Sequence, residues 1–177
     1  MNTEVDLLDL LDLLAGDSNE PKWTERDMLD LLALKLASEA QGNGGNRWIL
    51  AEHVRSKAGF DAPRVADAIA IDTWPSKGLE LHGFEVKVSR SDWLTELRQP
   101  EKSEPFRRFC DRWWLVVPDR QIVRAGELPD GWGLMAMRGH GLARIRSAPL
   151  MADRDPVSRD LLACLMRSAS LTARRRA

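Results

Sequence analysis

The order of hydrophobic and polar positions predicts helices at the N-terminal end of this chain. In "VDLLDLLDLL" (residues 5–14) an acid recurs at every third position among leucines, a pattern typical of an amphipathic helix. "GDSNEPK" (16–22) is typical of a linker, and Thr24 followed by Asp27 predicts the start of a second helix. The apolar stripe of that helix consists of Met28, Leu29, Leu32 and Leu36.

A third helix is expected next, and then the period of the pattern changes. Asn46 is a candidate N-cap for a helix over "RWILAEHVRSKA" (47–58). In contrast, "RVADAIAIDTW" (64–74) alternates along its length, which predicts a strand. "PSKG" is typical of a turn, so we expect "LELHGFEVKVS" (79–89) to return as the antiparallel partner strand.

The second half of the chain predicts further strands and helices. Ser91 is expected to cap a helix that two prolines then interrupt. "RWWLVVP" (112–118) is continuously apolar, which predicts a strand at the centre of a sheet. "GWGLMAMRGHGLARIRSAP" (131–149) predicts a hairpin and "PVSRDLLACLMRSAS" (156–170) a last helix, after which "ARRR" is expected to be frayed.

Length and composition limit the class of protein. A chain of 177 residues suits one core, so we expect a single domain that contains the strands and helices predicted above. It has no apolar run of membrane-spanning length, and acids interrupt the early leucines, so we expect a soluble intracellular protein. Two cysteines and three histidines provide neither a disulfide framework nor a zinc-like cluster.

The charge is unevenly distributed along the chain. Residues 1–40 contain ten acids and three bases, a net −7, which leaves +6 for the remainder of a chain whose formal net charge is −1. A basic body is compatible with a polyanionic partner such as DNA, because proteins bind phosphates largely through Lys and Arg. An ordinary mixed surface explains the same counts equally well.

The two strands that flank the turn carry the candidate chemistry. Glu85 and Lys87 share one face of their strand, and Asp67 on the preceding strand can approach them. Two converging carboxylates suit a hard cation such as Mg²⁺, with Mn²⁺ as a substitute, and the carbonyl of Val86 can supply a further oxygen. Such a cation can activate water for attack on a phosphodiester. Lys87 would hold the attacking water or help to deprotonate it, and would stabilise the pentavalent phosphate. The alternative is a polar cluster at a sheet edge in which Lys87 neutralises Glu85.

The segments "ADAIAI" and "FEVKVS" resemble the PD-(D/E)XK nuclease superfamily. The order of the later segments, through "RWWLVVP" and "GLARIRSAP", is similar to that of MmcB-like DNA repair proteins and related phage-encoded nucleases. The resemblance covers residues from about 47 to about 170. It implies a restriction-endonuclease-like α/β fold, in which a mixed sheet of about four to six strands is flanked by helices.

The resemblance also implies roles for individual residues. Asp67 and Glu85 match the metal-binding acids of the superfamily, and Lys87 matches its catalytic lysine. Glu52 is the candidate for an additional acid that many members carry on a helix before the first motif strand. Ala66 stands where the motif name has proline. The chain has no tyrosine, so it lacks the glutamine–tyrosine motif of RecB-type exonucleases.

Basic residues after the lysine strand are candidates for DNA contacts. They lie close to the proposed site in sequence and would meet phosphates without reading bases. The set is Arg90, Arg98, Lys102, Arg107 and Arg108. A solvated helix face is the alternative for each of them. Trp93, Trp113 and Trp114 can stack on exposed bases, although core positions are commoner for such residues.

Together these features predict a Mg²⁺-dependent deoxyribonuclease, with an endonuclease favoured, that acts in DNA repair, recombination or phage DNA processing. The expected organisation is an acidic helical segment over 1–45, a nuclease-like domain over 46–172 and a basic tail over 173–177. We expect the protein in the cytoplasm of a bacterium, or of the host cell if it is phage-encoded. The N-terminal helices are candidates for dimerisation or for docking a protein partner. The rival hypothesis is a catalytically silent DNA-binding or recruitment protein on the same fold.

Overall fold

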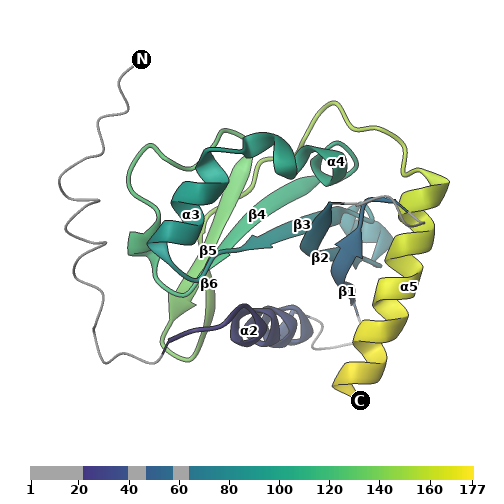
Figure 1. Ribbon diagram of the computed structural model, residues 1–177. Coiled ribbons are helices and arrows are strands. Elements are labelled where there is room, and N and C mark those ends of the chain that lie inside the picture. The colour runs from purple at the N-terminus through teal and green to yellow at the C-terminus, as the bar shows by residue number, and fades with distance from the viewer. Residues whose placement is uncertain (1–21, 40–46, 58–63) are drawn as a thin grey trace.

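The computed structural model describes residues 22–39, 47–57 and 64–177 (Figure 1). The described residues form one six-stranded sheet in the order β1-β2-β3-β4-β5-β6. The strands are β1 (Trp48–Arg55), β2 (Val65–Asp72), β3 (Leu81–Val86), β4 (Arg112–Val117), β5 (Trp132–Arg138) and β6 (Gly141–Arg146). The helices are α2 (Glu25–Ser38), α3 (Arg90–Leu97), α4 (Glu104–Arg107) and α5 (Arg159–Arg176), and short 3-10 turns span Pro75–Lys77, Pro100–Lys102 and Arg120–Ile122.

The sheet is mixed, as the sequence predicts. β1, β2 and β3 pair antiparallel, β3, β4 and β5 pair parallel, and β6 returns antiparallel to β5. The continuously apolar strand β4 lies at the parallel centre and is buried on both faces from Trp113 to Val117. The antiparallel partner strands and the C-terminal hairpin are also confirmed.

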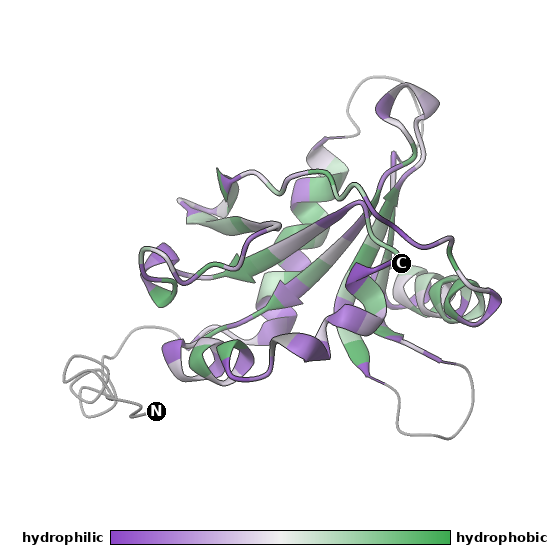
Figure 2. Cartoon of the chain, turned by 90° about the horizontal axis from the view of Figure 1, so that it is seen from above, coloured by the Kyte–Doolittle hydropathy of each residue, from purple (hydrophilic) through white to green (hydrophobic). Residues whose placement is uncertain are grey.

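Helices cover both faces of the sheet (Figure 1). α2 packs on one face through its predicted stripe of Met28, Leu29, Leu32 and Leu36. α3 and α4 cover the other face, and α5 lies beside β1 (Figure 1). The hydrophobic residues accordingly concentrate along the strands between these layers (Figure 2). In the part of the chain that the structure describes, no helix is both long and apolar enough to cross a membrane.

Tryptophans fill the core on both faces of β4. Trp113 packs on the α3 side and Trp114 on the α2 side, because successive side chains of a strand alternate. The Trp113 ring lies directly over Gly83 of β3, where an added Cβ would come within 2.1 Å of the ring carbon Cζ3. Trp93, Trp113 and Trp114 are all buried, so the structure favours core positions over base stacking.

The prediction of a helix over 47–58 is wrong, because Trp48–Arg55 forms the edge strand β1. Each of its ladder partners comes from β2, in an antiparallel register that runs from Trp48↔Asp72 to Arg55↔Val65. The β-favouring residues Trp48, Ile49 and Val54 agree with this pairing, and the strand places Val54 in the core. Pairing with β2 therefore makes this segment a strand, although its local pattern predicts a helix.

The helix boundaries are partly as predicted. Thr24 and Asp27 form a reciprocal capping box at the start of α2, which confirms that prediction. Ser89, not Ser91, caps α3, because its side chain accepts the hydrogen bond from the Asp92 N–H. The C-terminal "ARRR" is the last turn of α5, not a frayed tail. The predicted helix over 5–14 and most of the predicted linker lie outside the described residues.

Candidate functional site

Asp67 and Glu85 face each other at the point where the ladder between β2 and β3 ends. The last pair is Ala68↔Phe84, and Asp67 and Glu85 are the next residues in that register. The ladder does not continue as backbone pairing, because the Asp67 carboxylate accepts the hydrogen bond of the Val86 N–H at 2.7 Å. Since Phe84 and Val86 both point toward α2, Glu85 between them points toward the α3 face.

The backbone of Val86 lies beside the two acids. Its N–H is directed at Asp67. The N–H and C=O of one residue in an antiparallel strand point to the same side, so we expect its carbonyl to lie on the β2 side as well. The Val86 carbonyl stays a prediction as a third oxygen ligand, and this direction is compatible with it.

Lys87 lies between two carboxylates on the same face. Its Nζ is 2.5 Å from Glu85 Oε1 and 3.4 Å from Glu96 Oε2. Glu96 comes from α3, and its side chain is 7% exposed, against 15% for Lys87 and 13% for Glu85. The sequence analysis missed Glu96. A usable signal was present, because Glu96 is three residues after Trp93 and so shares its inward helix face.

The electrostatics of these groups follow from burial and mutual repulsion. Burial, together with the charge of neighbouring Asp67, raises the pKa of Glu85 to about 8, although Lys87 opposes the shift. Burial likewise raises the pKa of Asp67 to about 6 against the hydrogen bond from Val86. Burial alone would lower the pKa of Lys87, but attraction to Glu85, Asp67 and Glu96 outweighs it and raises that pKa above its ordinary value. Lys87 therefore stays protonated at neutral pH.

His53 borders the site from β1. The pairs Glu52↔Ala68 and Val54↔Ala66 place His53 opposite Asp67, with an unusual positive φ of 51°. Its Nδ1 lies 3.6 Å from Glu25 Oε1 in the first turn of α2. The N-terminal end of α2 therefore reaches the edge of the site.

The residues fit a divalent cation in their chemistry. Asp67 and Glu85 offer carboxylate oxygens, which are the ligands that Mg²⁺ prefers, and burial makes a negative charge on either side chain costly. Among the residues that the structure describes, no three His, Cys, Asp or Glu side chains are grouped to hold a metal ion. The candidate is therefore a two-carboxylate site, in which water and substrate would complete the coordination.

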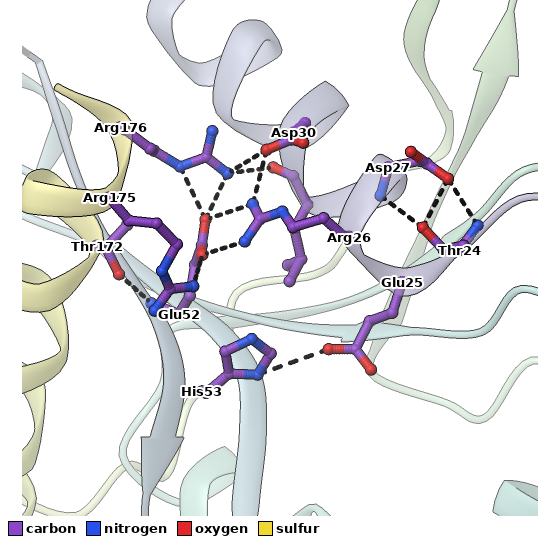
Figure 3. A network of polar contacts seen from close by, with 11 residues as sticks. Thr24, Glu25, Arg26, Asp27, Asp30, Glu52, His53, Thr172, Arg175 and Arg176 are labelled. Carbon is purple, nitrogen blue, oxygen red and sulfur yellow. Dashed lines mark hydrogen bonds and ion pairs between the residues drawn. The ribbon is translucent and has the colours of Figure 1, made fainter.

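Glu52 does not belong to this site, so its predicted catalytic role is wrong. It lies on β1 rather than on a helix, and its pairing with Ala68 places it on the face that α2 covers. Its carboxylate is fully buried among the guanidinium groups of Arg26, Arg175 and Arg176 (Figure 3). Burial would raise the pKa of Glu52, but hydrogen bonds from Arg26 and Arg176 lower it to about 2. Glu52 is thus a structural anion that joins α2, β1 and α5.

Three of the predicted DNA-binding residues have protein partners. The Arg90 guanidinium is bound to both carboxylate oxygens of Glu127 and to the Ile122 carbonyl, so it is a structural residue. Arg108 pairs with Asp155, and the pair is half exposed. Arg107 lies over the Trp132 ring, 5.7 Å from its centroid, and 3.9 Å from Glu104. Arg90 cannot contact phosphate without breaking its half-buried ion pair with Glu127.

Arg98 and Lys102 remain available for phosphate contacts. Arg98 is exposed at the C-terminal end of α3, and Lys102 is half-buried in the turn that follows. Neither side chain forms an ion pair within the described residues. Both follow Glu96 in the chain, so the helix that carries Glu96 toward Lys87 leads directly to these two cations.

Comparison with known proteins gives limited information. No family model and no curated protein matches this chain. Its fold is similar to a solved structure described as "SPO1766 protein of unknown function from Silicibacter pomeroyi", with a TM-score of 0.57. The sequences are 19% identical, and the match covers 88% of this chain and 90% of that chain. At this identity the similarity shows a shared fold over nearly the whole length.

Proposed function

We propose that this protein is a metal-dependent nuclease, favouring an endonuclease, that hydrolyses phosphodiester bonds in DNA. The observation that carries the proposal is the juxtaposition of Asp67 and Glu85 at the end of the β2–β3 ladder, with Lys87 on the same face. Buried carboxylates with raised pKa values beside a protonated lysine are typical of functional sites. The arrangement also agrees with the resemblance to PD-(D/E)XK nucleases.

Each residue has a distinct role in this proposal. Asp67 and Glu85, with the Val86 carbonyl, would hold Mg²⁺ or Mn²⁺, which supplies Lewis-acid activation of water and offsets charge on the phosphate. Lys87 carries its proton and therefore acts as a donor to a phosphate oxygen or to the attacking water, and not as a general base. Arg98 and Lys102 would fix the DNA backbone near the site.

The test is a cleavage assay on supercoiled plasmid, circular single-stranded DNA and branched DNA, with Mg²⁺, Mn²⁺ or a chelator. We expect metal-dependent cleavage that falls at least about 100-fold in Asp67→Asn and in Lys87→Ala, because each removes a group that acts on the reacting phosphate. Asp130→Asn, which changes an exposed aspartate, is the matched control and should cleave normally. Isothermal titration with Mg²⁺ should show binding to the wild type and the control but not to Asp67→Asn.

A second candidate function is DNA binding without cleavage. One observation favours it: both acids already have partners within the protein, since the Val86 N–H donates a hydrogen bond to Asp67 and Lys87 donates one to Glu85. In that case every DNA substrate would survive in both metals while the protein still shifts DNA in a gel, and Asp67→Asn would leave that shift unchanged. This result would replace the nuclease proposal.

A further inference from the structure

Glu96 is a buried acid for which neither the fold nor the proposed chemistry yet accounts. The residue is 6% exposed, and its Oε1 has no hydrogen-bond partner within the described part of the chain. A buried polar oxygen without a partner costs free energy, so an acid at this position needs an explanation. Its other oxygen, Oε2, points to Lys87 at 3.4 Å.

Lys87 has one close partner and one more distant partner. Its ammonium donates a hydrogen bond to Glu85 Oε1 at 2.5 Å, whereas Glu96 Oε2 forms an ion pair with it at 3.4 Å. Lys87 directly follows β3, which carries Glu85, whereas Asp67 comes from β2 and Glu96 from α3, so acids from three elements act on the ammonium. Glu85 is also the acid that the proposed function assigns to the cation.

We propose that Glu96 is a positioning residue that takes over the Lys87 ammonium when Glu85 turns to a bound divalent cation. This inference rests on the proposed function, because it concerns the same site. A carboxylate oxygen that binds a cation has less negative charge to offer a lysine, and the cation itself repels the ammonium. Glu96 Oε1 is then the open acceptor on the same face, and α3 holds it in place.

This exchange of the Lys87 partner from Glu85 to Glu96, called the handover below, gives a reason for an acid at this position of α3. Without Glu96, Lys87 would lose its remaining anionic partner at the step in which it must be aimed at the phosphate. With Glu96, the ammonium stays charged and directed toward the centre between Asp67 and Glu85. Glu96 acts through Lys87 and does not itself touch the reacting atoms.

The test observes the Lys87 ammonium directly, so it does not depend on catalysis. In protein carrying ¹⁵N on the lysine side chains, a hydrogen-bonded ammonium exchanges slowly and gives a resolved signal at low temperature, which Lys87→Arg would assign. We expect this signal in the wild type, in Glu96→Gln and in Glu85→Gln, since one carboxylate partner remains in each. We expect it to disappear in the double variant Glu85→Gln/Glu96→Gln. Glu101→Gln, an exposed acid just after α3, is the matched control.

Addition of Mg²⁺ separates this inference from the proposed function. In the wild type the signal should shift and persist, whereas in Glu96→Gln it should broaden or disappear. A Mg²⁺ effect that is the same in both proteins, or a signal that survives in the double variant, would overturn the handover. If Mg²⁺ does not change the signal of the wild type, the result counts against cation binding in the proposed function. The comparison of Glu85→Gln with Glu85→Gln/Glu96→Gln would still decide whether Glu96 holds the Lys87 ammonium.

The kinetic signature is a split between rate and affinity. In Glu96→Gln we expect kcat to fall about 10- to 100-fold with the DNA dissociation constant unchanged, as for partners that orient a catalytic group. Glu96→Asp keeps the charge and should recover part of the rate. Equal loss in Glu96→Asp and Glu96→Gln, with altered thermal unfolding, would show a purely structural residue.

Discussion

Glu85 carries an ionisable carboxyl in a place where burial and Asp67 both oppose its charge. Its pKa is about 8, above an ordinary value of 4.5, so the folded protein keeps a proton that the unfolded chain releases. Between those two pH values the wild type should therefore lose stability as pH rises, and the loss should be complete above pH 8. In Glu85→Gln, which resembles the protonated acid, this loss should be absent.

The measurement is urea unfolding of both proteins at about pH 5 and about pH 8. We expect similar stability at the lower pH and an advantage for Glu85→Gln on the order of 3 kcal/mol at the higher pH. Glu101→Gln should follow the wild type at both values, because its side chain is exposed. Parallel pH trends for the wild type and Glu85→Gln would show that Glu85 titrates normally.

At this scale the sequence located the central residues of the candidate site but not their surroundings. Asp67, Glu85 and Lys87 could be placed together because a strand has a period of two and a tight turn sets the register. Glu96 and the partners of Arg90 could not be found in this way. Their contacts depend on how α3 and the segment around Glu127 pack on the sheet, and no local pattern encodes that packing.

At the scale of elements, the end of α5 is joined to the rest of the fold by Glu52. Arg176 donates to Glu52 through Nε at 2.8 Å and to the Leu29 carbonyl at 3.1 Å, so one side chain connects α5, β1 and α2 (Figure 3). The edge of the sheet is closed at the same point, because the Glu52 N–H donates to Thr172 Oγ1. α5 is therefore part of the core architecture up to its last turn.

We expect Arg176→Ala to destabilise the protein by about 2 kcal/mol, because it withdraws a hydrogen-bonded partner from a buried carboxylate. Arg174→Ala, an exposed arginine in the same turn, is the control and should stay within about 0.5 kcal/mol of the wild type. Urea unfolding at neutral pH measures both. Since the Glu52 pKa is lowered to about 2, its stabilising contribution is full above pH 4.5 and is lost as pH falls through 2, so the difference between the two variants should shrink in acid. Equal effects of the two substitutions would contradict the role of Arg176.

Element type was predictable where pattern and length agreed. The apolar run of β4, the hairpin of β5 and β6, and the capping box of α2 were all read correctly. β1 was not, because its eight residues mix apolar and polar side chains at spacings that suit either a helix or a strand. Pairing with β2 decides between them, and that is a long-range interaction.

At the scale of the whole molecule, a mixed sheet between helices was predicted from the sequence. The sequence did not show where the acidic residues 1–21 join the described fold relative to the candidate site. Residues 1–21 contain six acids and no bases, a net −6, so the rest of the chain carries +5 within a total of −1. The chain enters the described fold at Lys22, just before α2. Glu25 in the first turn of α2 lies beside His53, which faces Asp67. The acidic segment is therefore attached at the edge of the candidate site.

This attachment predicts that the acidic segment competes with DNA phosphates for the basic surface. We expect the full-length triple variant Asp6→Asn/Asp9→Asn/Asp12→Asn to bind DNA roughly 3- to 10-fold more tightly at low salt, with the gain disappearing as salt rises. The control variant Glu101→Gln/Asp130→Asn/Asp153→Asn removes the same charge from exposed positions elsewhere. Fluorescence anisotropy over a salt series compares them. A gain confined to the N-terminal variant supports local competition, equal gains would show an effect of net charge alone, and no gain in either would rule out competition by these acids.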